Sequence, residues 1–233
     1  MAGNAAAGQS VHQGVRRLAQ LAAAASTLGL DVSPATLQQL MNYLDLLQRW
    51  NKVYNLTALR DPDDMLSRHL IDCLAALPAL RRHVAGLGGR RVRMLDVGSG
   101  GGLPGVVLAV TQPDWQVDCV DTVAKKSNFI RQASAELHLG NLRGLHARVE
   151  NLDPEAGRYD VITSRAFASL AVFTSLSQHL LADHGVWMAM KGRDPQDEQA
   201  KLPPGVQVFH VEQLQVPGLD AQRCLVWMRH APA

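Results

Sequence analysis

The sequence is poor in cysteine, in aromatic residues and in long apolar runs. Its 233 residues include 3 cysteines, none in a Cys-x-x-Cys spacing, and 5% aromatic residues. This argues against a disulfide framework or a zinc site, and we expect no metal and three buried, reduced thiols. The 9 histidines form no His-Glu-x-x-His pattern, and no apolar run reaches the length of a membrane span. We therefore expect a cytoplasmic protein with no membrane partner.

The sequence also has little excess of either positive or negative charge. The formal net charge is +2, with 23 Lys and Arg against 21 Asp and Glu. This balance permits binding to a nucleic acid without requiring it. With 47% hydrophobic residues, the chain can bury one substantial core. We expect one α/β domain with a small helical addition.

Local patterns divide the chain into three parts. Residues 1–10 are small and polar and are expected to form a disordered tail. Residues 11–90 are expected to form a helical extension, with helices over 11–28, 34–50 and 62–77, and Pro78 is expected to end the third. Residues 91–233 are expected to form a Rossmann-like domain.

A glycine-rich turn organises the third part, residues 91–233. An apolar run ends at Asp96-Val97, four glycines occupy the next five positions, and Pro104 begins another apolar run. The pattern predicts a strand, a tight turn and the start of a helix. Glycines allow positive φ and let a ligand approach bare amides, while a helix N-terminus adds partial positive charge. Such a turn suits a nucleotide-like ligand, although a purely structural turn is the alternative.

The spacing of the glycines separates the possible cofactors. A dinucleotide-binding fingerprint that starts at Gly98 would need its third glycine where Leu103 stands. A frame that starts at Gly100 fits but begins two residues late, so a dehydrogenase is the lesser alternative. The order Asp96-x-Gly98-x-Gly100-x-Gly102 instead resembles the first motif of class I S-adenosylmethionine-dependent methyltransferases. In that class an acid at the end of the next strand binds the ribose, and Asp121 occupies this position.

Strand and helix patterns alternate after the turn. They predict an α/β fold with a doubly wound, mostly parallel sheet. The helices are expected over 105–111, 124–139 and 170–181, and further strands over 117–120, 142–147, 159–163, 185–190, 206–215 and 223–230. Ligands bind such sheets at the carboxyl ends of the strands, where Gly98, Asp121, Glu150 and Arg165 fall. Residues 192–204 are expected to form a mobile loop over that face.

Four segments together resemble the RsmG (GidB) family. They are Trp50 to Thr57, Arg68 to Asp72, Asp96 to Gly105 and Ser164 to Ala166. Members of that family are bacterial methyltransferases that act on N7 of a guanine in small-subunit (16S) ribosomal RNA. The resemblance runs from about Asp31 to Lys191. It implies S-adenosyl-L-methionine as cofactor, ribosomal RNA or a ribosomal particle as partner, and we expect a monomer.

The resemblance also implies roles for individual residues. Catalytic roles fall on Arg165, Lys191 and Asn51, and RNA contacts on Asn55, Arg60, Arg68 and His69. Cofactor contacts fall on Gly98, Ser99, Gly100, Leu103, Asp121, Val149, Glu150 and Arg165. Two departures occur: Cys73 replaces an expected serine, and no motif follows Gly192.

Several of these residues have a structural alternative. Arg165 could form an ion pair with a neighbouring carboxylate, Asp121 could cap the next helix, and His69 could be a core residue. The connector 50–60 could be a loop whose Asn and Thr side chains bond the backbone. These alternatives stay open at the level of sequence.

The chemistry of guanine N7 agrees with what the sequence lacks. N7 carries a lone pair and no hydrogen, so it needs alignment rather than a general base. Methylases of exocyclic amines carry Asn-Pro-Pro-Tyr or Asp-Pro-Pro-Tyr after the fourth strand, whereas this chain has Thr163-Ser164-Arg165. A methyltransferase of a small molecule, or a non-catalytic nucleotide- or RNA-binding module on the same fold, are the alternatives.

Overall fold

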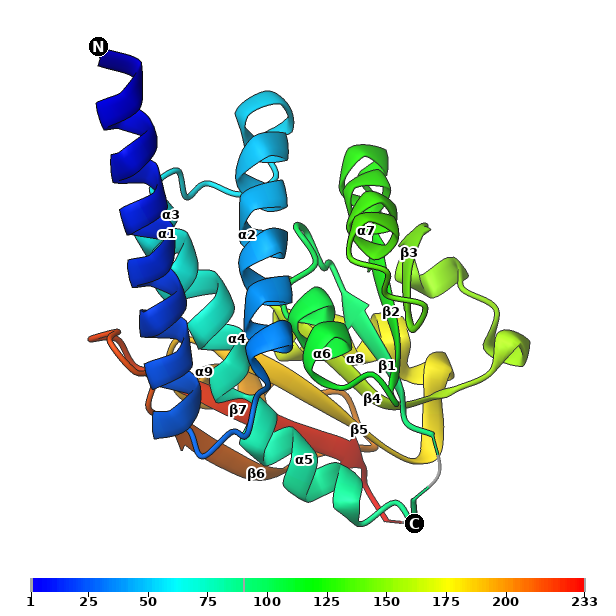
Figure 1. Ribbon diagram of the computed structural model, residues 1–233. Helices are drawn as coiled ribbons and strands as arrows, with labels where there is room; N and C mark the ends of the chain where they lie inside the picture. Colours follow the sequence, from blue (N-terminus) through cyan, green and yellow to red (C-terminus); the bar gives the residue numbers. More distant parts are fainter. Residues whose placement is uncertain (1, 90, 233) are drawn as a thin grey trace.

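A seven-stranded sheet forms the centre of the molecule (Figure 1). The computed structural model describes residues 2–89 and 91–232, and side chains from residue 12 onward within these ranges. The strand order is β3-β2-β1-β4-β5-β7-β6, with β7 antiparallel to both of its neighbours and the remaining pairs parallel. The strands are β1 (Arg93–Val97), β2 (Gln116–Asp121), β3 (Leu142–His146), β4 (Tyr159–Arg165), β5 (Leu181–Lys191), β6 (Val206–Leu214) and β7 (Arg223–His230). The predicted doubly wound, mostly parallel sheet is confirmed.

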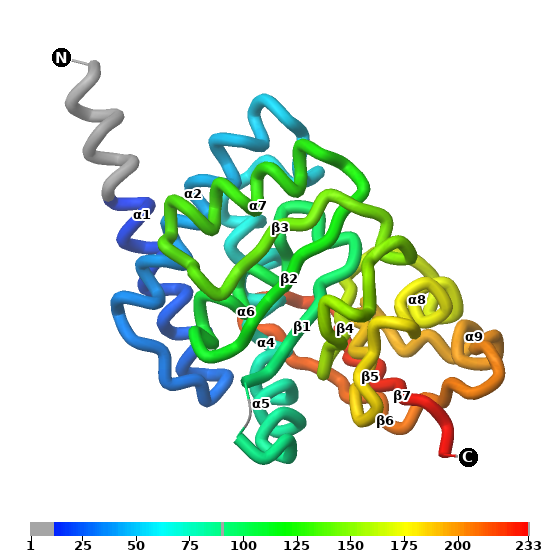
Figure 2. Tube along the Cα trace, turned by 90° about the vertical axis from the view of Figure 1, so that its right-hand side faces the viewer, coloured from blue at the N-terminus to red at the C-terminus, as the bar shows by residue number. Residues whose placement is uncertain are grey.

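Helices cover both faces of this sheet. Figure 2 shows α1 and α2 on one side and α8 and α9 on the other. Before the sheet come α1 (Ala2–Thr27), α2 (Pro34–Tyr54), α3 (Pro62–Met65), a π-helical turn (Leu66–Ile71), α4 (Asp72–Ala75) and α5 (Leu77–Ala85). Within the sheet region come α6 (Gly105–Thr111), α7 (Ala124–Glu136), α8 (Leu170–Ser177) and α9 (Gln196–Gln199). No helix in these described ranges is long and apolar enough to cross a membrane.

Side chains cap the starts of two helices. The hydroxyl of Ser33 accepts a hydrogen bond from the Thr36 amide at 3.1 Å at the start of α2. The Asp61 carboxylate accepts from the amides of Asp63 and Asp64 at the start of α3. Both caps precede a proline in the first turn, where the missing amide hydrogen of proline costs no hydrogen bond.

The region after Pro62 differs from the predicted single helix. It is interrupted by the π-helical turn, and Pro78 does not end it but lies in the first turn of a further helix, α5. Proline is tolerated there because the first-turn amide has no intrahelical partner. The expected loop 192–204 contains the short helix α9. The disorder expected for residues 1–10 stays a prediction: α1 begins at Ala2, but the side chains there lie outside the described part of the chain.

Alternating side chains of the strands form two apolar layers. On β1, Met94 packs with the helices of residues 12–89, whereas Leu95 packs toward α8. On β5, Met188 and Trp187 divide in the same way. This alternation follows from the two-residue period of a strand. The helical extension therefore shares one core with the sheet, which fixes its position beside the glycine turn.

Candidate active site

The glycine turn connects β1 to α6 in a conformation that favours glycine. Gly98, Gly100 and Gly102 have φ values of 66°, 57° and 85°. The amides of Gly98 and Ser99 donate to the Val120 carbonyl at 2.9 and 3.2 Å, which holds the turn against the end of β2. The turn thus lies at the carboxyl ends of the central strands, as predicted.

A neighbouring aromatic ring occupies the space that a side chain at position 98 would need. A Cβ at this position would lie 2.4 Å from Cδ2 of Phe167, which is closer than such atoms can approach. Phe167 in turn packs edge to face on Phe173 of α8, with ring centroids 6.4 Å apart. Gly98 therefore permits the contact between the turn and the segment that follows β4.

Asp121 connects the end of β2 to the turn. Its Oδ2 accepts a hydrogen bond from the Gly100 amide at 3.1 Å, and Lys126 Nζ lies 3.5 Å away. Its Oδ1 accepts from the Val123 amide at 2.9 Å, next to the start of α7. The carboxylate thus bonds the residue before α7 but not an amide of the first turn of that helix, so the capping alternative is not realised, and Asp121 lies beside the glycine turn.

A first cavity of about 250 Å³ lies between these elements. Its apolar wall includes Val120, Val149 and Phe167, and Asp121 and Glu150 contribute carboxylates. A flat, partly apolar ring and a pair of ribose hydroxyls suit such a lining, because carboxylates accept hydrogen bonds from hydroxyls. We call it the cofactor cavity.

Buried polar atoms without partners gather beneath the turn. Oδ1 of Asp96 and the hydroxyl of Thr163 have no hydrogen-bond partner among the residues that the structure describes. Asp96 Oδ2 accepts from the Gly105 amide at 2.8 Å, while burial raises the pKa of this carboxyl to about 7. Unpaired buried polar atoms are costly, which favours a polar ligand or ordered water at the turn. The residues present therefore fit S-adenosyl-L-methionine.

A second cavity, of about 540 Å³, lies between the turn and the helical extension. We call it the substrate cavity. Gly98 and Ala166 line both cavities, so the two adjoin at the carboxyl ends of β1 and β4. Ser99, Gly100 and Leu103 line the substrate cavity, as do Arg68, His69, Asp72, Arg165, Lys191 and Arg223.

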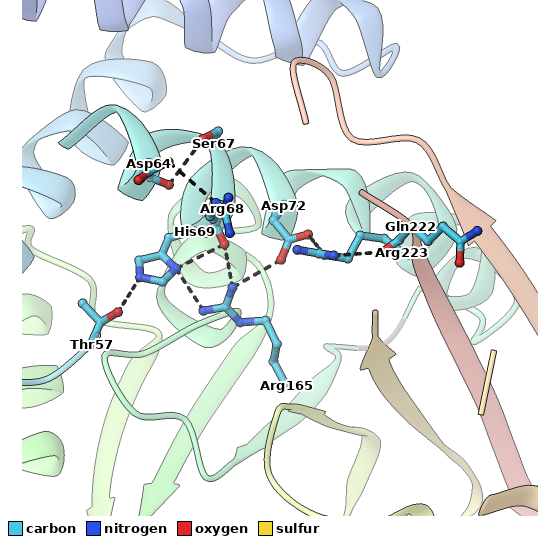
Figure 3. A network of polar contacts seen from close by, with 9 residues as sticks. All are labelled: Thr57, Asp64, Ser67, Arg68, His69, Asp72, Arg165, Gln222 and Arg223. Carbon is cyan, nitrogen blue, oxygen red and sulfur yellow. Dashed lines mark hydrogen bonds and ion pairs between the residues drawn. The ribbon is translucent and has the colours of Figure 1, made fainter. Parts of the chain in front are cut away.

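Arg165 extends from β4 toward the helical extension (Figure 3). Its Nη1 donates to the Arg68 carbonyl at 2.8 Å and to Asp72 Oδ2 at 3.2 Å. Asp72 Oδ1 also accepts from Arg223 Nε, at the start of β7, at 2.8 Å. The ion pair weighed as an alternative for Arg165 is thus present, but it lies in the cavity wall.

His69 is buried in the same network. Its Nδ1 lies 3.3 Å from Arg165 Nη2, and its Nε2 lies 2.8 Å from the Thr57 hydroxyl (Figure 3). Burial lowers the pKa of His69 to about 4, and the Arg165 charge acts in the same direction. His69 is therefore neutral near pH 7 and has polar neighbours at both ring nitrogens.

The connector after α2 is ordered by its own side chains. Asn51 is 2% exposed; its amide donates to the Leu59 carbonyl and its Oδ1 accepts from the Thr57 amide, both at 2.9 Å. Arg60 bonds the Asn51 carbonyl and the Asn55 side chain. None of Asn51, Asn55 and Arg60 lines either cavity, so their predicted contacts with substrate stay predictions.

Lys191, at the end of β5, is engaged elsewhere in the cavity wall. Its Nζ lies 2.9 Å from Glu198 Oε2 of α9 and donates to the Ala168 carbonyl at 3.1 Å. The Glu198 carboxylate also accepts from the Leu170 amide. Lys191 thus links the segment 192–204 to the substrate cavity.

Sequence reasoning assigned no role to three residues of this site. Phe167 directly follows the Ser164 to Ala166 motif, and Asp72 ends another motif, so both lay next to a usable signal. Arg223 lies 151 positions from Asp72 in a closing strand without a motif. Only the fold brings it to the cavity.

The fold and the turn define a class. A parallel sheet with an antiparallel β7, a glycine turn after β1 and an acid at the end of β2 make this a class I methyltransferase fold. Solved structures share it: TrmN from Thermus thermophilus (23% identity, TM-score 0.50, 71% of this chain and 53% of that one). The ribosomal protein L11 methylase from Lactobacillus delbrueckii subsp. bulgaricus also shares this fold (14% identity, TM-score 0.51, 68% of this chain and 78% of that one).

Sequence comparison gives the family. The family GidB, rRNA small subunit methyltransferase G, matches residues 36–226. The ribosomal RNA small subunit methyltransferase G of Paracidovorax citrulli is 60% identical over 219 residues, which is 91% of this chain and 89% of the relative. The protein of the same name from Acidovorax ebreus is 61% identical over 210 residues, 88% and 92% of the two chains. The chain belongs to the rRNA small subunit methyltransferase G family, which confirms the resemblance found in the sequence.

Proposed function

We propose that this protein transfers a methyl group from S-adenosyl-L-methionine to N7 of a guanine in small-subunit ribosomal RNA. The observation that carries the proposal is the junction of two cavities at Gly98 and Ala166. One cavity suits an adenosine group, and the other is lined by cationic side chains. A methyl donor that spans the junction would meet a base that enters from the second cavity.

The charge of the substrate cavity favours RNA over a small neutral molecule. Among the described residues that line it, four are cationic and one is a carboxylate: Arg68, Arg165, Lys191 and Arg223 against Asp72. Lys191 and Arg68 also pair with Glu198 and Asp64 outside the lining, and the positive charge that remains attracts phosphate groups. Arg68 is the most exposed of these cations, with 53% of its side chain accessible, and suits a phosphate contact.

The protonation states of the cavity favour an acceptor that needs no general base. His69 is neutral and has neighbours at both nitrogens, and Asp72 is paired with two arginines. Lys191 is paired with Glu198. None of these three groups is free to remove a proton. Guanine N7 presents a lone pair and no hydrogen, so its methylation fits this lining.

Roles for the individual residues follow from their places. S-Adenosyl-L-methionine, when bound, supplies a methyl group bonded to a positively charged sulfur. Asp121 and Glu150 would accept hydrogen bonds from its hydroxyls and amino groups, and the glycine turn would support its methionine part. Arg165 would hold the guanine, because its planar guanidinium can donate to the O6 atom of the base. The lone pair of N7 would then face the methyl donor at the junction of the cavities.

The test is methyl transfer to a defined atom. The protein is incubated with labelled S-adenosyl-L-methionine and small ribosomal subunits from a strain that lacks this enzyme. Mass spectrometry of the digested RNA should detect 7-methylguanosine at one site. Arg165→Gln should reduce the rate by at least about tenfold, since a hydrogen bond to a charged group is worth about 1.5–3 kcal/mol. Label in another base, or none, would refute the proposal.

A further inference from the structure

Asp72 lies between two arginines that come from different strands. Its Oδ2 faces Arg165 Nη1 at 3.2 Å, and its Oδ1 faces Arg223 Nε at 2.8 Å. The Asp72 side chain is 4% exposed, whereas those of Arg165 and Arg223 are 20% and 24% exposed. Figure 3 shows the enclosed carboxylate between the two guanidiniums, and both arginines line the substrate cavity.

We propose that Asp72 is a positioning residue for methyl transfer, and that Arg223 belongs to the RNA-facing site through it. Asp72 fixes the guanidinium of Arg165 over the junction of the cavities, and Arg223 fixes the plane of the Asp72 carboxylate. This inference rests on the proposed function. It gives a role to the carboxylate of the helical extension and to a residue of the last strand.

The hydrogen bonds of Arg165 support this role. Nη1 is held by two acceptors four residues apart in the same helical stretch, the Arg68 carbonyl and Asp72. Nη2 faces His69. An arginine side chain has many rotamers, and contacts of this kind select one of them. A preorganised donor is what a transferring enzyme needs, because a misplaced base lowers the rate steeply.

Electrostatics require the carboxylate in this place. Two guanidiniums and the neutral His69 share a half-buried wall, and the two cations would repel each other without an anion between them. A buried ion pair contributes little net stability compared with apolar packing. The arrangement is therefore better explained by the aim of the two arginines into the cavity than by stability.

The principal test compares Asp72→Asn with the wild type. Steady-state methylation of small subunits should lose at least about tenfold in kcat, because the guanine is held in fewer productive poses. The KM for S-adenosyl-L-methionine should stay within about twofold, since Asp72 does not line the cofactor cavity. Asp64→Asn, which changes an exposed carboxylate of α3 that lines neither cavity, is the matched control and should leave both constants unchanged.

A double-mutant cycle separates positioning from general damage. If Asp72 acts through Arg165, then Asp72→Asn should reduce kcat by less than about threefold in an Arg165→Gln background. Additive losses would overturn the proposal. Arg223→Gln should cause a smaller loss than Asp72→Asn and no further loss in the Asp72→Asn background, and Arg223→Lys should recover part of it. If Asp72→Asn does not fold, these two Arg223 variants carry the test, and an unchanged kcat in Arg223→Gln would overturn the proposal.

One measurement does not depend on activity. The side-chain Nε–H signal of Arg165 in a nitrogen-15 NMR spectrum of the wild-type protein should shift and exchange faster in Asp72→Asn, and not in Asp64→Asn. An unchanged signal would show that Asp72 does not hold Arg165. If the wild type does not methylate guanine N7 but the signal responds, the proposed function fails while the positioning of Arg165 stands.

Discussion

Asp121 accepts a hydrogen bond from the amide of Gly100 at 3.1 Å, so the end of β2 and the glycine turn are held by one carboxylate. This side chain is 5% exposed and lines the cofactor cavity. A group that orders the turn and also faces the ligand should affect binding in two ways. Removal of the carboxylate takes a hydrogen-bond acceptor from the ligand and also loosens the turn.

Asp121→Ala should therefore weaken the binding of S-adenosyl-L-methionine by about 10- to 100-fold, the loss expected for a hydrogen bond to a charged group. Isothermal titration calorimetry measures it directly. Asp118→Asn is the matched control on the same strand: Asp118 is fully buried and pairs with Arg143 and Tyr159, away from both cavities. It should lower the melting temperature and leave the affinity unchanged. Equal affinity in wild type and Asp121→Ala would rule out the ribose contact.

Gly98→Ala should damage both stability and cofactor binding. The φ of 66° costs an alanine about 1–2 kcal/mol, and the added Cβ would meet Phe167 at 2.4 Å. Thermal unfolding should show a lower melting temperature, and the double variant Gly98→Ala, Phe167→Ala should relieve the clash but not the φ strain. Gly140→Ala is the control, because its Cβ would meet no atom within 4 Å. A wild-type melting temperature in Gly98→Ala would contradict this account.

Stability should depend on the protonation of Asp96. Burial raises the folded pKa of this carboxyl to about 7, against an ordinary value of 3.8. At pH values between these two pKa values the folded state binds a proton that the unfolded state has lost. The free energy of unfolding therefore falls as the pH rises from about 4 to about 7. The full effect is about 4 kcal/mol.

Denaturant unfolding at several pH values in this window provides the measurement. Asp96→Asn keeps the acceptor for the Gly105 amide and cannot ionise, so its stability should decline less than that of the wild type as the pH rises. The comparison with this variant is needed because His69, whose folded pKa is lowered, acts with the opposite sign between about 4 and 6.5. Parallel curves for the two proteins would disprove the assignment.

Arg165→Gln should raise the pKa of His69 above about 4. Burial is the larger cause of the lowered pKa and stays in the variant, so the value should still lie below 6.5. The imidazole signals in an NMR titration report it. Arg68→Gln is the control: this exposed side chain does not perturb His69, although its carbonyl does. An unshifted His69 in Arg165→Gln would show that the two side chains do not interact.

The sequence predicted the features that are encoded locally. The glycine turn, the Asp121 position and the alternation of strands and helices each lie within a short window, where period and spacing are informative. The prediction that Pro78 ends a helix was wrong, because a proline is compatible both with the end of one helix and with the first turn of the next. The Asp72 network could not be predicted, since its members lie 93 and 151 positions apart and meet only in the folded chain.

The π-helical turn Leu66–Ile71 sets the angular phase of the residues after it. The Asp72 amide donates to the Ser67 carbonyl five residues back, one more than in an α-helix. One residue of α-helix corresponds to about 100° of rotation, so the wide turn shifts α4 by roughly that angle relative to α3. In a regular α-helix Asp72, seven residues after Met65, would lie within about 20° of the direction of Met65, whereas the wide turn rotates Asp72 off that face. Deleting one residue of this turn other than Arg68 and His69 would therefore rotate Asp72 away from Arg165 and Arg223 while every side chain that lines the substrate cavity is kept.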